Sequence, residues 1–421
     1  MYNIYLRSIK DLIEKRKETG PIVESNYISS VIKNRRLELK LTLSETTENI
    51  CSEAFLSKIE RNLMKPFNDR VELLCERLDL DYHTLINLEN NDRIEKLINY
   101  FIENNYDGIM QLNDNTLDNV FIAQDEIIKV YKYYINKDFK NAHLSIIQLD
   151  NVKECLSDLE LFALLLILFE IYFYTHQHYK ALEYIGYLLN INYSDKKIKL
   201  FLNERKFILS CKMNLYNVNI LFEEIRKDLH LYSMDNQIAI LLHYNGLLNN
   251  EQAYQYIFDM ENKYIPKNLI EEYYYTKITI LTKQNKHLEA MKEVIECGKI
   301  HIRFACLYAY NLLMYSLNKE NILEVNKYKA NLISYIKLCD QGPGETYHIA
   351  FLRLMQHEID GSPLEIICNY IKNQLLKELK EYSCVLYDEY IIDRYCLLLG
   401  KLCRYKDAYL YLLEMKMHLK K

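Results

Sequence analysis

A short polar turn followed by an alanine recurs along most of the chain, and this repetition limits the possible folds more than any other feature. The clearest copies end at Ala142, Ala181, Ala253, Ala290 and Ala408. Their spacings of 39, 72, 37 and 118 residues fit one, two, one and three steps of similar length. A repeat of this length is one pair of helices that buries its apolar face on the neighbouring pairs. We therefore predict a stack of helical hairpins.

Weaker copies near residues 216–220, 319–325 and 361–365 fill the gaps in this series. The pattern resembles the tetratricopeptide repeat in a degenerate form with a longer period, and it runs from Gln124 to the end of the chain. The chain has only 9 Gly and 5 Pro, too few for a sheet-rich protein with many tight turns. The resemblance implies an all-α protein in which a right-handed α-solenoid follows a small N-terminal bundle.

A second pattern, upstream of the repeats, predicts two short helices joined by a tight turn. Thr42 and Glu45 have the spacing of a capping box, so a helix is expected to start at Leu43 and to end near residues 49–50. Ser52 is placed to cap the next helix, in which Phe55, Leu56 and Ile59 form an inward stripe. This geometry allows the second helix to enter a DNA major groove.

Residues 27–88 resemble the Xre-type helix-turn-helix of phage repressors, with Leu56-Ser57-Lys58-Ile59-Glu60 as the most specific segment. The sequence departs from that pattern at Thr46 and Thr47, where a Leu-Ala pair is usual. A plain helical bundle without DNA binding is the alternative. We predict three parts: an amphipathic helix and linker (1–22), the DNA-binding domain (23–90) and the repeat domain (91–421).

The exposed face of the second helix is expected to contact DNA. The predicted DNA-binding residues are Arg35, Thr42, Ser52, Glu53, Ala54, Phe55, Ser57, Lys58 and Arg61. In the second helix, the first turns are expected near base edges and contain Glu53, Ala54, Phe55 and Ser57. Lys58 and Arg61 are better suited to contact phosphate. Core packing is the alternative for Phe55, and pairing with Glu38 is the alternative for Arg35 and for Arg36. Glu60 is expected to bind an arginine or backbone within the bundle.

An Xre-type domain followed by a helical stack resembles the RRNPP receptors, which are peptide-sensing transcription regulators of the Rgg, PlcR and PrgX kind. This resemblance implies a cytoplasmic homodimer that binds double-stranded DNA and a short signalling peptide, as in quorum sensing. Two alternatives remain open. The stack could be a protein-interaction scaffold tethered to DNA, or the chain could be a phage-encoded receptor of the same architecture that controls lysis and lysogeny.

Peptide-binding positions are predicted from the first helix of each hairpin, which lines the inner face of a stack. The predicted residues are Asn203, Glu204, Asn245, Tyr275, Tyr310, Asn311 and Arg353. An asparagine amide both donates and accepts, so it can bind the backbone of an extended peptide. A surface role is the alternative for each asparagine, because the chain is rich in this residue.

The remaining features argue against other classes of protein. The sequence contains no GxSxG, Walker loop or HExxH, and its 11 Cys include no CxxC pair, so we expect no enzyme, cofactor or metal site. The longest apolar run, 161–169, is too short to cross a membrane. Residues 27–66 carry seven Lys/Arg and five Glu, a net charge of +2. One module with so little charge binds DNA weakly, which favours a dimer.

Overall fold

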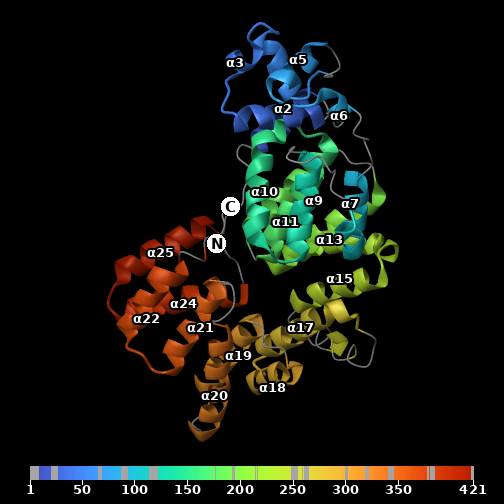
Figure 1. The fold of residues 1–421 in the computed structure, drawn as a ribbon. Helices are drawn as coiled ribbons and strands as arrows, with labels where there is room; N and C mark the ends of the chain where they lie inside the picture. The colour runs from blue at the N-terminus through green and yellow to red at the C-terminus, as the bar shows by residue number, and fades with distance from the viewer. Residues whose placement is uncertain are drawn as a thin grey trace. The chain divides into compact units, whose positions relative to one another are not determined.

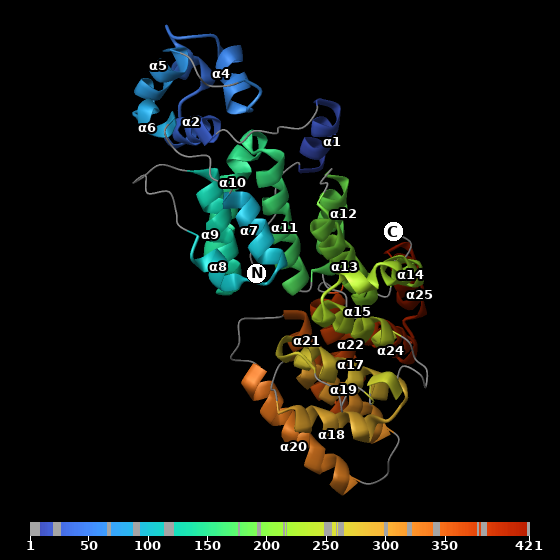
Figure 2. The ribbon, with the colours of Figure 1, turned by 90° about the vertical axis from the view of Figure 1, so that its right-hand side faces the viewer.

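The fold is taken from a computed structural model of the chain (Figures 1 and 2). It describes residues 9–19, 27–64, 69–86, 93–112, 122–175, 177–191, 195–213, 215, 217–247, 255–257, 259, 265–298, 302–317, 322–339, 346–376, 379 and 385–418. In these ranges every regular element is a helix, so the all-helical prediction is confirmed. None of the described helices is long and apolar enough to cross a membrane.

The chain divides into two compact units, residues 1–174 with 180–202 and residues 175–179 with 203–421. The first unit contains α1 (Ile9–Thr19), α2 (Tyr27–Glu38), α3 (Leu43–Thr47), α4 (Glu53–Glu60), α5 (Asp69–Arg77), α6 (Tyr82–Ile86), α7 (Arg93–Ile102), α8 (Tyr106–Met110), α9 (Ala123–Ile135), α10 (Phe139–Val152), the 3-10 turn η1 (Lys153–Cys155), α11 (Asp158–Tyr174) and α12 (His178–Asn190). The predicted domain boundary at residues 87–92 lies outside the described residues.

The second unit continues in the same hairpin pattern. It contains the greater part of α13 (Lys196–Lys212), then α14 (Val218–Lys227), α15 (Met234–Leu247), α17 (Ile270–Lys283), α18 (His287–Cys297), α19 (Ile302–Leu317), α20 (Ile322–Cys339), α21 (Thr346–Ile359), α22 (Leu364–Tyr370), the π-helical turn η5 (Ile371–Leu375), α24 (Val385–Lys401) and α25 (Tyr405–His418). Short 3-10 turns, η2 (Leu229–Leu231) and η4 (Lys267–Leu269), lie between them.

Helices α2 to α6 share one hydrophobic core, which we call the N-terminal bundle. Its fully buried side chains come from α2, α4 and α5 and include Ile32, Leu56, Ile59, Val71 and Leu74. Leu56 and Ile59 belong to the stripe expected from the sequence, and Phe55 packs at the edge of the core. Ile122, just before α9, joins the same core, so the bundle is continuous with the helices that follow it.

The predicted alanine positions mark real helix starts. Ala142, Ala181, Ala290 and Ala408 each occupy the fourth position of a helix, in α10, α12, α18 and α25. The first three are fully buried, which allows close packing against the preceding helix. The fifth copy, at Ala253, lies outside the described residues.

Three of these hairpins also share one turn geometry. The residue five positions before the alanine has a left-handed backbone, with φ of 57° at Lys137, 57° at Asn285 and 58° at Cys403. The N–H of the next residue donates to the carbonyl five residues earlier, at 2.9, 2.9 and 2.8 Å. This is the hydrogen bond that closes a Schellman-type helix end. The repetition seen in the sequence is therefore a repetition of backbone geometry.

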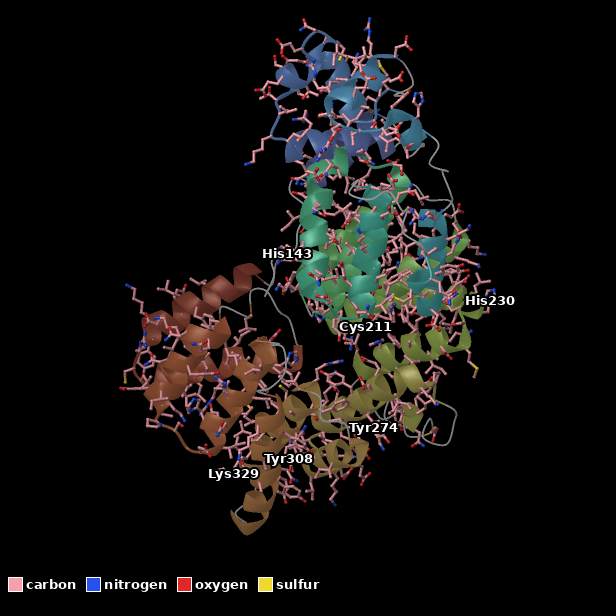
Figure 3. All side chains as sticks on the ribbon, viewed as in Figure 1. His143, Cys211, His230, Tyr274, Tyr308 and Lys329 are labelled. Carbon is pink, nitrogen blue, oxygen red and sulfur yellow. The ribbon has the colours of Figure 1, made fainter. Side chains whose placement is uncertain are left out.

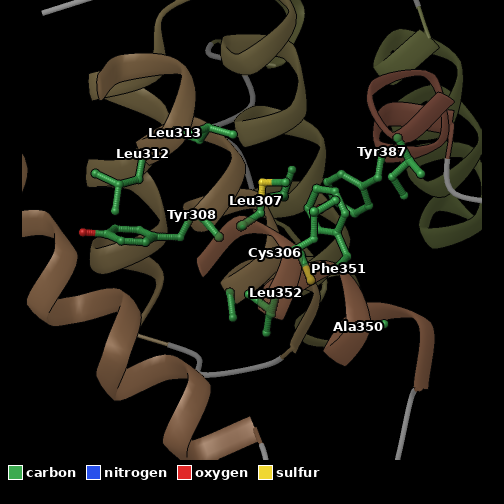
Figure 4. Close-up of a cluster of buried hydrophobic side chains, with 14 of the residues drawn as sticks. Cys306, Leu307, Tyr308, Leu312, Leu313, Ala350, Phe351, Leu352 and Tyr387 are labelled. Carbon is green, nitrogen blue, oxygen red and sulfur yellow. The ribbon is translucent and has the colours of Figure 1, made fainter. Parts of the chain in front are cut away.

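The largest described core of the second unit lies between α17 and α25 (Figure 4). Phe351 on α21 stacks on Tyr387 of α24, with ring centroids 4.2 Å apart. Tyr308 on α19 lies toward α20 and donates from Oη to the carbonyl of Tyr328 at 3.0 Å (Figures 3 and 4). The tyrosines of this core are used for packing, and their hydroxyls bind backbone carbonyls, as at Tyr308 and Tyr370, or a carboxylate, as Tyr347 does with Asp388.

Candidate nucleic-acid interface and ligand-facing helices

The start of α3 is fixed by the capping box that the sequence predicts. The backbone N–H of Glu45 donates to Thr42 Oγ1 at 3.2 Å, and the backbone N–H of Thr42 donates to Glu45 Oε2 at 2.7 Å. These bonds from Thr42 hold the pKa of the Glu45 carboxyl below its ordinary value. The side chain of Thr42 is therefore committed to the helix start, and α3 ends at Thr47, earlier than expected.

The threonines that depart from the usual Leu-Ala pair are accommodated by local hydrogen bonds. Thr46 and Thr47 are buried, and their hydroxyls donate to the carbonyls of Thr42 and Leu43 at 2.8 and 2.9 Å. A buried hydroxyl bonded in this way avoids the cost of an unsatisfied polar group. The two threonines are therefore compatible with a helical α3.

Helix α4 has one buried face and one solvent-exposed face. Ser52 is its N-cap and accepts from the N–H of Phe55 at 3.2 Å, as predicted. Glu53, Ala54 and Lys58 are exposed, and Ser57 is half-buried. Ser52 is exposed but uses its hydroxyl in the cap.

The other candidate residues at this face have contacts within the bundle. Arg61 is half-buried and its Nε donates to the carbonyl of Ser57 at 3.1 Å. Phe55 is half-buried, with the Arg70 guanidinium 6.0 Å from its ring centroid. Arg35 contacts Glu38 at 3.3 Å and donates to the carbonyl of Leu78 at 3.2 Å, which matches the alternative of local pairing.

Arg36 and Glu60 form a buried ion pair inside the N-terminal bundle. Arg36 donates to the two oxygens of Glu60 at 2.6 and 2.8 Å, and its third nitrogen reaches the carbonyl of Leu41 at 2.8 Å. The pair joins α2 to the end of α4, so it sets the position of α4 against the rest of the bundle. The structural role predicted for Glu60 is confirmed, and Arg36 is directed into the bundle.

Within the first unit, side-chain contacts also join the N-terminal bundle to the turn between α10 and α11. The thiol of Cys155 donates to the carbonyl of Glu60 at 2.6 Å, and Lys33 lies 3.7 Å from Glu154. Arg16 of α1 binds the other side of this turn, through Asp158 at 2.7 Å and the carbonyl of Leu156 at 2.6 Å. The C-terminal end of α4 therefore contacts the first hairpins directly, and α1 is a docked helix in its described part.

The predicted peptide-binding residues lie on α13, α15, α17, α19 and α21, the first helices of successive hairpins. Asn203 and Arg353 are exposed, whereas Asn245, Tyr275 and Tyr310 are half-buried. Asn245 donates to the carbonyl of Leu241, one turn earlier, at 2.8 Å.

Glu204 and Asn311 point into the second unit. Glu204 is buried and accepts from Asn236 at 2.7 Å. Asn311 is fully buried, donates to Thr282 Oγ1 and to the carbonyl of Leu307 at 2.8 Å each, and lies 2.8 Å from His287. Its amide is used by the protein itself, so we leave Asn311 out of the ligand-facing set.

A group of charged side chains, not expected from the sequence, joins four of these first helices. Glu272 on α17 lies 3.5 Å from Lys212 on α13, 3.4 Å from His243 on α15 and 3.7 Å from Arg303 on α19. We call these four residues the carboxylate cluster. The guanidinium of Arg303 also lies 4.0 Å from the ring centroid of Tyr275, one of the predicted ligand residues.

The spacing of the cluster gave no signal in the sequence. Its members are separated by 31, 29 and 31 residues, which are shorter than the repeat steps of 37 and 39 residues. They therefore occupy different positions in their helices, with Lys212 at the end of α13 and Glu272 in the first turn of α17. Within the described residues, no group of three or more His, Cys, Asp or Glu could hold a metal ion.

Comparison with known proteins found no relative of this chain. No family model matches the chain, and neither a curated protein nor a solved structure matches it. The functional interpretation therefore depends on the residues and their geometry.

Proposed function

We propose that the chain is a DNA-binding transcription regulator in which α3 and α4 act as a helix-turn-helix and α4 reads the major groove. The observation that carries this proposal is the two-sided character of α4. Its apolar stripe is buried with Leu56 and Ile59, while Glu53, Ala54 and Lys58 are exposed on a helix capped by Ser52. Such a short, polar, rigidly capped face suits base edges and phosphates.

The proposal extends to the hairpins, which we interpret as a tetratricopeptide-like solenoid that binds a short signalling peptide. The shared turn geometry of three hairpins supports the solenoid. Half-exposed amide, phenol and guanidinium groups on the first helices support peptide binding, since an extended peptide needs both donors and acceptors. Asn245, Tyr275 and Tyr310 are the residues that we expect to line the site, with Asn203 and Arg353 at its margins.

The DNA-binding half is tested by selection from a pool of random duplexes with the purified full chain. We expect enrichment of a short motif present twice at a fixed spacing, because two modules of low net charge are needed for firm binding. A pool that stays random after repeated selection would overturn the proposal. Enrichment of a single unpaired motif would support DNA reading but contradict the dimer.

The dimer surface that we propose is the outer face of α25. Tyr405 and Tyr409 are 68% and 63% exposed there, and Leu410, Leu412 and Leu413 are exposed beside them. A contiguous group of exposed apolar side chains on one helix is typical of a protein–protein interface. This face suits a second copy of the chain, related by twofold symmetry.

Replacing both Tyr409 and Leu412 with glutamate is therefore expected to convert the dimer into a monomer. Burying like charges at a symmetric contact is unfavourable, so the molar mass measured by light scattering should fall by half. The matched control changes Leu144 and Ile147 to glutamate and should leave the mass unchanged, because these two are also exposed apolar residues but lie on α10. An unchanged mass for the α25 variant, or a wild-type monomer, would contradict this interface.

A further inference from the structure

The C-terminal end of α4 is completed by a residue from outside the N-terminal bundle. The last four carbonyl groups of an α-helix have no partner within the helix, so other groups must satisfy them. In α4, the carbonyls of residues 57–59 accept from residues 61–63, which directly follow the helix, at 2.9 to 3.1 Å. The carbonyl of Glu60 accepts from the thiol of Cys155 at 2.6 Å. The fourth donor therefore comes from the turn η1, 95 residues away in the sequence.

This contact lies where the helices α10 and α11 meet the N-terminal bundle, and it is shielded from water (Figure 2). Cys155 and Glu60 are only 2% and 4% exposed. Burial raises the pKa of the Cys155 thiol to about 12, so the thiol stays protonated and donates at neutral pH. A buried carbonyl that loses its donor costs the full penalty of desolvation. Without the thiol, the end of α4 would therefore move toward solvent.

The turn that contains Cys155 is itself held on both sides. Ser157 and Glu160 form a capping box at the start of α11, in which the N–H of Ser157 donates to Glu160 at 2.8 Å and the N–H of Glu160 donates to Ser157 at 3.2 Å. Arg16 of α1 donates to Asp158 at 2.7 Å and to the backbone of the turn at 2.6 Å. The position of the turn is therefore fixed relative to α11, and a displacement of α11 would displace Cys155 with it.

Glu60 connects this turn to the rest of the bundle. Its carboxylate is bound by Arg36 of α2, while its carbonyl is bound by Cys155, so the residue is fixed at both ends. Lys33, one turn before Arg36 on α2, lies 3.7 Å from Glu154 of the same turn η1. A displacement of η1 would therefore change the position of α4 relative to α2.

We propose that Cys155 is a positioning residue for DNA reading, which holds the C-terminal end of α4 in the position that fits the major groove. This inference rests on the proposed function, because it assigns the control of α4 to a contact from the helices that follow the bundle. Without the hydrogen bond, α4 would occupy the fitting position for only a fraction of the time. The apparent affinity for DNA would fall by the same fraction.

Cys155→Ala tests this role in the full chain. It removes the donor, so the affinity for the selected duplex, measured by electrophoretic mobility shift, should fall at least about fivefold. Cys155→Ser keeps a donor at the same place, so its affinity should stay within about twofold of the wild type. The matched control is Cys306→Ala, which removes another buried thiol that donates to a backbone carbonyl, that of His348 in the second unit. This control should leave the affinity unchanged.

A second variant loosens the turn without changing the bundle. Arg16→Gln removes the charge that binds Asp158, so the affinity for the duplex should fall at least about threefold. In this variant and in Cys155→Ala, hydrogen exchange should become faster at the end of α4, while the amides of α5 should exchange as in the wild type. Unchanged exchange in α5 separates a displaced α4 from a general loss of fold.

The outcomes separate this inference from the function on which it rests. Wild-type affinity for Cys155→Ala or Arg16→Gln would overturn the positioning role while DNA reading stands. Equal losses for the alanine and serine variants at Cys155, or an equal loss for Cys306→Ala, would overturn it as well. A chain that selects no duplex would overturn the proposed function and this inference together.

Discussion

Arg36→Ala is expected to destabilise the N-terminal bundle by about 3–5 kcal/mol, because it leaves the buried carboxylate of Glu60 without its partner. The side chains of Arg36 and Glu60 are only 11% and 6% exposed, and their bond is bidentate. The measurement is hydrogen exchange of the α2 and α4 amides, since a chain of two units need not unfold in one step. Exchange in the second unit should stay as in the wild type.

Two comparisons show whether the buried charge is the cause. Arg226→Ala breaks a pair whose side chains are 65% and 62% exposed, and it should cost less than about 1 kcal/mol. Replacing both Arg36 and Glu60 with methionine removes the buried charges together, so it should be much less harmful than Arg36→Ala alone. If the double variant were as unstable as the single one, packing and not charge would explain the effect.

Replacing both Ser57 and Lys58 with alanine is expected to weaken binding to the selected duplex by at least about 100-fold. Each hydrogen bond to a charged group is worth about 1.5–3 kcal/mol, and a dimer loses the contacts at both half-sites. Lys58 is exposed and Ser57 is half-buried at the edge of the open face, so the bundle core is left intact. Electrophoretic mobility shift with the selected duplex measures the loss.

The matched control for this variant is Ser334→Ala with Lys337→Ala, an exposed serine and lysine on α20. It removes the same groups and the same charge from the chain, and binding should stay within twofold of the wild type. Binding by the Ser57 and Lys58 variant at wild-type strength would mean that α4 is not the recognition helix. Both variants must keep the wild-type molar mass and the wild-type hydrogen exchange of the α2 amides, so that a change in DNA binding reflects the lost contacts and not a loss of fold.

Local chemistry made the starts of α3 and α4 predictable. A capping box and an N-cap depend on side chains within three residues of one another, so the sequence around Thr42 and Ser52 contains all the required information. The starts of α10, α12, α18 and α25 were predictable for a similar reason, since a small residue is required wherever two helices approach closely. Glycine often marks the helix ends before them, but here lysine, asparagine and cysteine take the left-handed position.

The faces of the long helices were harder to predict than their positions. Asn311 was assigned to the ligand face beside Tyr310, but adjacent residues of a helix point about 100° apart. Asn311 therefore points into the core, toward Thr282 and His287. Arg36 was expected outside the bundle because its partner, Glu60, is distant in sequence. The carboxylate cluster was missed because it forms only when four helices pack together, and pairwise patterns within one helix contain no trace of it.

We propose that a peptide held by the hairpins changes how the N-terminal bundle binds DNA. The direct measurement is the affinity of the full chain for the selected duplex, with and without a saturating amount of a peptide that the chain retains from a pool of synthetic random hexapeptides. We expect a change of at least about tenfold in either direction, a coupling free energy of about 1.4 kcal/mol or more. An unchanged affinity with the peptide fully bound would contradict the claim.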